Sequence, residues 1–200
     1  MSEKIPMPKS ICVFADSSSG AHPQYTQAAR ELGRELAARN YGLVYGGASV
    51  GLMAVVADTV LEAGGNVTGV IPEFLVKKEV AHTRLSDLRV VRSMHERKTL
   101  MAELADGFVA LPGGFGTIEE FFEVLTWGQL GMHQKPCALL DVGGYYERLL
   151  EFLDYATSER FLKPVHRSII LVAADARTLL SDFEKYRAPN VPKWIRAEIT

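Results

Sequence analysis

An α/β fold with a doubly wound, mainly parallel sheet and helices on both faces is predicted by three features of the sequence. Short apolar and β-branched runs alternate with longer segments of helical period along the 200 residues. The strand-like runs are apolar at consecutive positions, as expected for strands buried on both faces. Glycines follow the second and fifth of these runs, at the strand ends where such sheets bind ligands. Together these features indicate a Rossmann-like architecture with right-handed crossovers.

Each element follows from its local pattern. The segment 23–39 carries Ala28 and Leu32 on one apolar face, which is typical of an amphipathic helix. Pro72 is expected to end the third strand because proline cannot donate to the ladder. In chain order, strands are expected at 10–14, 43–45, 66–71, 89–91, 107–111, 136–141 and 168–172, and helices at 23–39, 50–63, 95–105, 117–130, 145–156 and 176–186.

No linker, repeat or low-complexity segment divides the chain. Residues 1–200 are therefore expected to form a single Rossmann-like nucleotide-binding domain with tails at 1–9 and 188–200. The 22 basic and 24 acidic residues leave a formal charge of -2, which argues against nucleic acid and anionic membranes as partners. Neither a signal peptide nor a membrane span is expected, and Cys12 and Cys137 read as buried thiols. A cytoplasmic location follows.

The segment from Pro112 to Thr117, with sequence PGGFGT, predicts a phosphate-binding turn at a helix N-terminus. Its three glycines let the backbone approach a ligand closely, and a helix is expected to begin at Thr117. Free N–H groups and the positive end of the helix dipole then favour an anion. The pattern is neither a Walker A motif nor the dinucleotide fingerprint. A tight turn without a ligand is the alternative.

Glu119 and Glu120 follow in the first turn of that expected helix. Thr117 and Glu120 fit a capping box, in which the two side chains satisfy each other's backbone N–H groups. The same position also puts a carboxylate beside a bound phosphate, where general acid or base chemistry is needed. Spacing alone leaves the capping and catalytic interpretations equally supported.

A second capping box, from Ser93 to Glu96, is expected to open the helix at 95–105. Arg97 and Lys98 follow it, although the helix dipole disfavours cations near an N-terminus by up to ~1 kcal/mol each. A solvated face could tolerate Lys98. For the pair, an anion contact by Arg97 is the better interpretation, because a guanidinium binds phosphate in a bidentate manner.

Other polar residues carry less information. The loop after the first strand, from Asp16 to Gly20, is rich in hydroxyls, but Ser17, Ser18 and Ser19 have no evident base to activate them. The five histidines lack metal-ligand spacing, so no metal is assigned. On its local pattern Glu79 reads as solvated surface. The loops after the first, second and fifth strands are expected to converge on one crevice.

Assembled, these residues resemble the LONELY GUY (LOG) family of cytokinin riboside 5′-monophosphate phosphoribohydrolases, whose members have often been mislabelled lysine decarboxylases. The resemblance runs from about residue 11 to residue 186. The signature PGGxGTxxE is met from Pro112 to Glu120, and the partner motif is met by His95-Glu96-Arg97-Lys98. Further segments similar to the family lie at 45–47, 50–53, 69–72 and 126–127.

The resemblance implies hydrolysis of the N-glycosidic bond in a nucleoside 5′-monophosphate, giving free base and ribose 5-phosphate. It implies Arg97 and Glu120 as the catalytic pair, and it moves Glu79 from the surface into the site. It requires no metal or other cofactor. The residues expected to contact the nucleotide are Ser18, Gly46, Gly47, Glu79, Met94, Lys98, Gly113, Gly114, Phe115, Gly116, Thr117, Ile118, Glu119 and Thr126.

Two departures from the family pattern stand in this sequence. Asp16 follows Ala15 where relatives carry Cys-Gly or a similar small pair, and it brings a carboxylate towards the pocket. Ala48 replaces a common third glycine. A homodimer is expected, partly from the resemblance and partly because 50–61 is apolar around much of its circumference.

A non-catalytic carrier of nucleotides or phosphorylated cofactors is the alternative function. Such a carrier needs the glycine turn but not both Arg97 and Glu120. Lysine decarboxylation is disfavoured because no pocket pattern for a Schiff-base lysine is found. An NAD-dependent oxidoreductase is disfavoured because GxGxxG is absent after the first strand.

Overall fold

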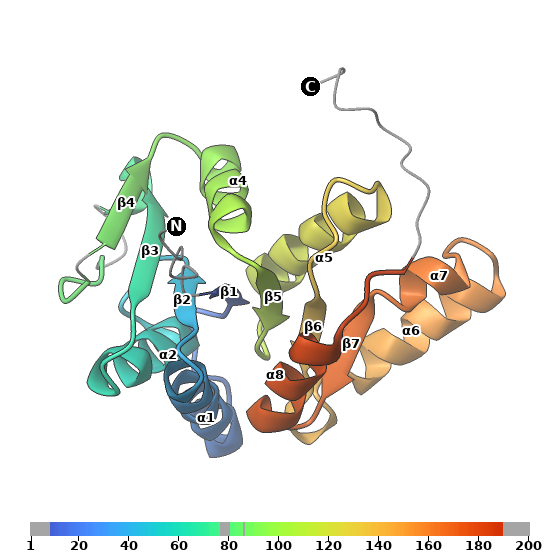
Figure 1. Ribbon diagram of the computed structural model, residues 1–200, viewed down its shortest axis with the longest axis horizontal. Coiled ribbons are helices and arrows are strands. Elements are labelled where there is room, and N and C mark those ends of the chain that lie inside the picture. The colour runs from blue at the N-terminus through green and yellow to red at the C-terminus, as the bar shows by residue number, and fades with distance from the viewer. Residues whose placement is uncertain (1–8, 77–80, 86, 190–200) are drawn as a thin grey trace, which may run out of the picture.

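The computed structural model describes residues 9–76, 81–85 and 87–189. Its seven-stranded sheet has the order β4-β3-β2-β1-β5-β6-β7, and every neighbouring pair is parallel (Figure 1). The predicted doubly wound α/β fold is therefore confirmed. The strands are β1 (Ser10–Phe14), β2 (Gly42–Tyr45), β3 (Val67–Pro72), β4 (Asp87–Val91), β5 (Gly107–Ala110), β6 (Cys137–Leu140) and β7 (Ile170–Ala173).

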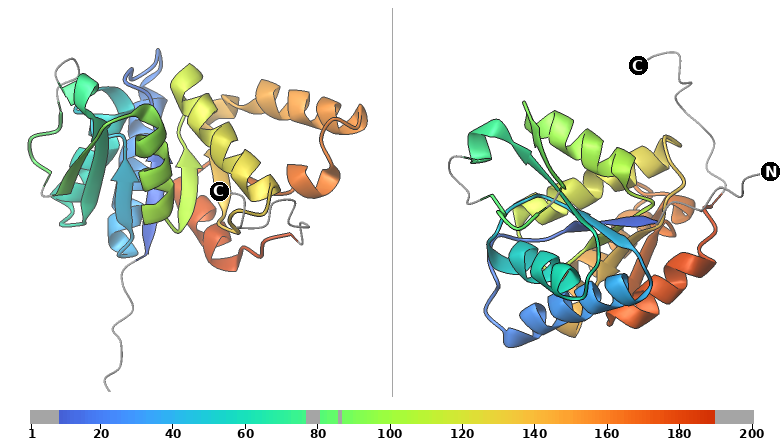
Figure 2. Two further views of the ribbon diagram at one scale, coloured as in Figure 1. Left: turned by 90° about the horizontal axis from the view of Figure 1, so that it is seen from above. Right: turned by 60° about the vertical axis from the view of Figure 1, so that its left-hand side comes forward.

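Helices cover both faces of the sheet (Figure 2). One face carries α1 (Pro23–Ala38), α2 (Gly51–Glu62) and α8 (Ala176–Lys185), the other carries α4 (Met94–Leu104), α5 (Phe115–Gln129) and α6 (Glu147–Ser158), and the short segments are α3 (Glu73–Val76), η1 (Val142–Gly144) and α7 (Pro164–Arg167).

The core consists of two apolar layers separated by the sheet. Successive residues of a strand point to opposite faces. Ile11 and Val13 therefore pack with α1, α2 and α8, whereas Cys12 and Phe14 pack with α4, α5 and α6. All four side chains are at most 3% exposed. Burial on both faces explains why the strand sequences are continuously apolar.

The chain reverses its direction of winding between β1 and β5, which are neighbours in the sheet but not in sequence. At such a point the loops that leave adjacent strands diverge to opposite faces and leave a crevice. The loops after β1 and β5 meet at this edge, where the Leu111 amide donates to the carbonyl of Phe14 at 3.0 Å. The fold therefore puts the predicted glycine turn beside the loop that contains Asp16.

Several element boundaries differ from those predicted. The helix expected from Thr117 begins at Phe115, and the one expected from Tyr145 begins at Glu147. The second shift arises because Gly143 and Gly144, with φ of 63° and 74°, form a separate turn first. The strand expected at 168–172 is displaced towards the C-terminus, and the strand expected at 89–91 starts at Asp87. The segments α3 and α7 are too short to show a helical period and were not predicted.

Candidate active site

The turn after β5 leads directly into α5. Gly114 is the N-cap, with extended φ and ψ of -86° and -150°, and the first intrahelical bond runs from the Ile118 amide to its carbonyl. The amides before Ile118 therefore have no partner within the regular helix and lie at its positive end. A Cβ at Gly113 would overlap the Thr117 side chain, whereas a Cβ at Gly116 would meet nothing within 4 Å. The approach to Gly116 is open.

The predicted capping box between Thr117 and Glu120 is wrong. Because α5 starts two residues before Thr117, its N-cap is a glycine, which makes no side-chain cap bond. Thr117 is buried, with its Oγ1 unpartnered, and Glu120 lies in the second turn. Capping therefore does not explain the carboxylate at position 120.

Arg97 comes from the first turn of α4. Here the second predicted capping box is formed in part: the Glu96 amide donates to Ser93 Oγ at 3.1 Å, and the Glu96 carboxylate accepts from the Arg92 amide at 2.8 Å. In a complete capping box the Glu96 carboxylate would accept from the amide of the N-cap, Ser93, but here it accepts from the amide of the preceding residue. Both contacts hold the start of α4 at the carboxyl edge of the sheet.

The Arg97 guanidinium is buried, at 8% exposure, between α4 and the loop after β2. Its Nη2 donates to the carbonyl of Gly46 at 3.3 Å, and its Nη1 lies 3.8 Å from Met94 Sδ. A Cβ at Gly46 would overlap Nη2, so only glycine leaves room for the guanidinium. The Arg97 Nε has no hydrogen-bond partner. A buried cation with an unused donor is unusual unless it serves a ligand.

Glu120 is also buried, at 9% exposure, and it interacts electrostatically with Arg97. Burial raises its pKa to about 7, while Arg97 opposes this rise and Glu119 adds to it. The carboxyl group therefore changes between its neutral and charged forms near neutral pH. Proton transfer is most efficient in that range.

Lys98 belongs to a separate group of charges. Its Nζ lies 2.6 Å from Glu119 Oε1 and 3.1 Å from Glu123 Oε2. Partial burial lowers the pKa of Lys98, but the bonds to the two carboxylates outweigh it and the net pKa is raised. The charge of Glu119 is thus balanced by Lys98 at a half-exposed position. Glu120, by contrast, is buried and interacts electrostatically with Arg97.

The loop after β1 faces the glycine turn. The Gly114 amide donates to Asp16 Oδ2 at 2.7 Å, and the Ser18 amide donates to Asp16 Oδ1 at 2.9 Å. A cleft of about 180 Å³ lies between these two loops, and Tyr25, Leu52 and Tyr145 complete its lining. Ser18 and Gly114 therefore line the cleft together, as expected for loops at the switch point.

The loop after β2 is supported by the segment at 81–85. Gly47, at φ 77°, accepts from the His82 amide at 3.0 Å, and Ala48 pairs with Ala81 as an antiparallel bridge. His82 is buried and its Nε2 lies 2.8 Å from Asp58 Oδ1. The predicted contact residue Glu79 lies outside the described residues.

Some of the predicted contact residues are not gathered at the turn. Thr126 lies 11 residues after the start of α5, about 16 Å along the axis, and its Oγ1 donates to Phe122 O. It shares an exposed stripe with Glu119, seven residues away. The Ile118 amide is used within the helix. Phe115 and Met94 are 95% and 36% exposed and present apolar surface at the two helix starts.

Two tyrosines that were not predicted as site residues brace the glycine turn. Tyr146 Oη donates to the Leu111 carbonyl at 2.6 Å, and Tyr145 Oη donates to the Gly113 carbonyl at 2.9 Å. Both come from the segment between β6 and α6. Two consecutive tyrosines after Gly143-Gly144 were the available signal, because a tyrosine hydroxyl needs a hydrogen-bond partner when its ring is buried, as the ring of Tyr146 is.

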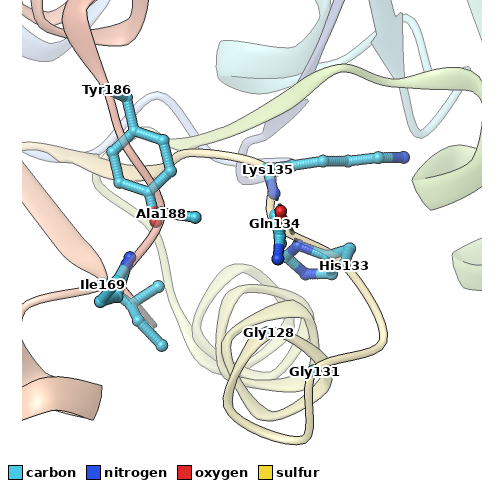
Figure 3. A pocket seen from close by; sticks show the side chains of 9 residues that line it. Gly128, Gly131, His133, Gln134, Lys135, Ile169, Tyr186 and Ala188 are labelled. Carbon is cyan, nitrogen blue, oxygen red and sulfur yellow. Dashed lines mark hydrogen bonds between the residues drawn. The ribbon is translucent and has the colours of Figure 1, made fainter. Parts of the chain in front are cut away.

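A second hollow lies at the opposite end of the strands, between the C-terminal end of α5 and the segment after α8 (Figure 3). His133 and Lys135 contribute to it from the loop before β6, and Tyr186 lines the other side. The Lys135 Nζ points away to the Ala102 carbonyl at 2.9 Å. None of the predicted site residues lines this hollow.

Within the described ranges, no three His, Cys, Asp or Glu side chains gather as a metal site would require. No helix among residues 9–76, 81–85 and 87–189 is long and apolar enough to cross a membrane. Cys12 and Cys137 are both free and buried. Burial, followed by the charge of Glu120, raises the pKa of Cys12, so this buried thiol stays protonated and is not expected to react.

Known proteins are similar to this chain in fold and in sequence. The fold is similar to that of the molybdenum cofactor carrier protein of Chlamydomonas reinhardtii, with a TM-score of 0.67 and 23% identity over 90% of this chain and 98% of that one. The TM-score shows a similar fold, and at 23% identity the similarity concerns the fold alone. The family description "Possible lysine decarboxylase" matches residues 53–183.

Two relatives are much more similar in sequence. A cytokinin riboside 5′-monophosphate phosphoribohydrolase of Arabidopsis thaliana is 50% identical over 178 residues, covering 89% of this chain and 82% of the relative. One of Rhodococcoides fascians is 52% identical over 171 residues, covering 85% and 86%. The resemblance seen in the motifs is confirmed, and the chain belongs to the LONELY GUY family of cytokinin riboside 5′-monophosphate phosphoribohydrolases.

Proposed function

We propose that this protein hydrolyses the N-glycosidic bond of nucleoside 5′-monophosphates of the cytokinin type and releases the free base and ribose 5-phosphate. The observation that carries the proposal is that Arg97 and Glu120 are both buried and interact electrostatically, near the start of α5, where the amides of Phe115, Gly116 and Thr117 have no partner within the helix. Relatives at 50% and 52% identity that bear this activity in their names support it.

The 5′-phosphate binds at the N-terminus of α5. The amides of Phe115, Gly116 and Thr117 precede the first intrahelical bond, and the helix dipole favours negative charge there. The phosphate does not react, so its binding energy orients the ribose for cleavage.

Glu120 acts on the sugar. Cleavage passes through an oxocarbenium-like transition state, which the charged carboxylate stabilises. A pKa near 7 lets the same group take a proton from water as the oxygen adds to C1′. The electrons of the broken bond stay with the base nitrogen, and the base leaves in its neutral form when this nitrogen gains the proton that Glu120 has taken from water.

Arg97 has two roles that its position supports. Its Nε is an unused donor beside the site, so it holds a phosphate or ribose oxygen, or it donates to the departing base. The other groups proposed to contact the nucleotide are Ser18, Gly46, Gly47, Glu79, Met94, Lys98, Glu119, Thr126 and the turn from Gly113 to Ile118.

Product analysis separates this hydrolase from a carrier of similar fold. Incubation with AMP or isopentenyladenosine monophosphate, followed by chromatography, is expected to yield free base and ribose 5-phosphate. The absence of base from both substrates at high protein concentration would leave the carrier function.

Glu120→Gln is expected to lower kcat by about 10²–10⁴-fold, the usual contribution of general acid–base catalysis. Its melting temperature is expected not to fall, because the side chain caps nothing. Glu119→Gln is the matched comparison, since it removes the adjacent carboxylate from an exposed ion pair. A larger loss in Glu119→Gln than in Glu120→Gln contradicts the assignment.

Lysine decarboxylation is not proposed despite the name of the family description. A Schiff base requires a neutral amine, and Lys98, the lysine beside the candidate site, has a raised pKa because Glu119 and Glu123 hold it charged.

We also propose that the whole chain is one nucleotide-binding domain that works as a cytoplasmic homodimer. The apolar circumference of α2 no longer supports the dimer, because Leu52, Val56 and Val60 are buried within the chain. Exposed aromatic residues support it instead: Phe115 and Phe161 are 95% and 90% exposed. The two free thiols are consistent with a reducing compartment.

A further inference from the structure

Asp16 places a carboxylate against the first amide of the helix that is proposed to bind phosphate. Its Oδ2 accepts from the Gly114 amide at 2.7 Å, a short charge-assisted bond. A Cβ at Gly114 would lie 3.2 Å from the same oxygen, so the carboxylate is packed directly on the N-cap. One of the donors that an incoming anion would use is thus already occupied.

The position of this carboxylate is fixed by its own loop. Asp16 Oδ1 accepts from the Ser18 amide at 2.9 Å. The start of α2 supports the loop from below: the Met53 amide lies 3.4 Å from the Asp16 carbonyl, and the Leu52 amide lies 3.4 Å from the Ser18 carbonyl. A Cβ at Gly51 would overlap the backbone of Ser17, which shows how closely the two segments pack. The carboxylate is therefore preorganised and does not swing freely.

A bound phosphate and this carboxylate would compete in two ways. They would share the donor at Gly114, and they would repel each other at close range across the 180 Å³ cleft that Asp16 lines. A neutral hydroxyl is attracted to Asp16 and not repelled by it, because the hydroxyl can donate a hydrogen bond to the carboxylate. The same residue thus penalises a 5′-phosphate and accommodates a 5′-hydroxyl.

We propose that Asp16 is a specificity-determining residue. It reduces the factor by which nucleoside 5′-monophosphates are preferred over nucleosides, so that unphosphorylated nucleosides are further substrates. This inference rests on the proposed function. Sites that hydrogen-bond a substrate hydroxyl discriminate strongly between substrates that present it and those that do not. Asp16 supplies such an acceptor at the glycine turn, where the 5′ substituent of the ribose is proposed to bind.

Two variants separate charge from hydrogen bonding. Asp16→Asn keeps the shape of the side chain and removes the charge, and Asp16→Gly also frees the Gly114 amide. Glu159→Gln removes one negative charge from the exposed end of α6 and serves as the control. Thermal melting of all three identifies folded protein, and a variant that melts like the wild type is carried forward.

Calorimetric titration with ribose 5-phosphate and with ribose at low ionic strength is the first measurement. Both Asp16 variants are expected to bind ribose 5-phosphate about ten-fold more tightly than the wild type, from the removed repulsion. Ribose is expected to bind no more tightly, and Glu159→Gln is expected to match the wild type. Unchanged or weaker ribose 5-phosphate binding in a folded Asp16→Asn protein overturns the proposal.

Turnover of AMP and adenosine is the second measurement. The ratio of kcat/KM for AMP to kcat/KM for adenosine is expected to rise about ten-fold in Asp16→Asn, through KM and not kcat. An equal ratio in variant and wild type overturns the inference while leaving the hydrolase intact. If the wild type releases adenine from neither substrate, the proposed function fails, and the titration still decides whether Asp16 opposes phosphate.

Discussion

Glu119 and Glu120 are adjacent in sequence but lie in opposite environments. The first is half-exposed and forms an ion pair with Lys98, whereas the second is 9% exposed and interacts electrostatically with Arg97. A helix turns by about 100° per residue, so neighbouring side chains face different directions. The motif pattern named both residues, but only their burial separates an ion pair on the surface from a carboxyl group with its pKa near 7.

The raised pKa of Glu120 makes the stability of the protein depend on pH. The folded carboxyl titrates near 7 and the unfolded one near 4.5, so Glu120 lowers the free energy of unfolding as pH rises through this window. Glu120→Gln is therefore expected to be stabilising at pH 8, by up to about 3 kcal/mol, and nearly neutral at pH 4.5.

Urea denaturation of both proteins at pH 4.5, 6 and 8 measures this difference. Groups other than Glu120 titrate in both proteins and cancel in the comparison. A stabilisation that is the same at all three pH values would show that Glu120 titrates normally in the folded protein.

At the scale of elements, the start of α5 differs from the prediction by two residues. Glycine has a low helix propensity, so the rules favoured a helix from Thr117 and not from Phe115. Tertiary contacts overrule this preference: Tyr145 and Tyr146 hold the turn before the helix, and Gly113 makes room for the Thr117 side chain. By contrast, the Ser93 cap of α4 was predictable because its determinants are three residues apart.

Gly116→Ala tests the proposed role of the α5 start. The added methyl group would meet no atom within 4 Å, and alanine is favoured over glycine in a helix by about 1 kcal/mol. The melting temperature is therefore expected to hold or rise. Affinity for ribose 5-phosphate is expected to fall at least about ten-fold, because the methyl group takes the space that a phosphate needs.

Calorimetry and thermal melting of the same sample check this prediction. Gly65→Ala is not a suitable control, since its Cβ would crowd Val60. Gly64, whose φ is 76°, is also unsuitable, so the wild type and Glu159→Gln serve as references. Retained affinity in a stable Gly116→Ala protein would place the phosphate elsewhere.

At the scale of the whole molecule, alternation of strands and helices was enough to predict the parallel sheet and its crevice. Buried strands are apolar throughout, and this pattern is visible without knowing any partner. The contacts that shape the crevice were not predictable. Asp16 and Gly114 are 98 positions apart, and Tyr146 and Leu111 are 35 apart. No local pattern encodes such pairs.

The proposed homodimer is a property of the whole surface. Light scattering with size-exclusion chromatography is expected to give twice the 22.0 kDa of one chain. The physical reason is that large apolar side chains, among them Phe115 and Phe161, remain exposed in a single chain. A mass of 22.0 kDa across micromolar concentrations would contradict the dimer.

The space above Gly46 has a consequence for comparing this protein with others of the same fold. Any side chain at that position would occupy the volume of the Arg97 guanidinium. A related chain with a larger residue there cannot seat an arginine in the same way, whatever its helix α4 encodes. Glycine at position 46 is therefore a useful marker in related sequences. Where it is present, an arginine aligned with Arg97 has room for its guanidinium at this site, and where a larger residue replaces it, the aligned arginine has no such room.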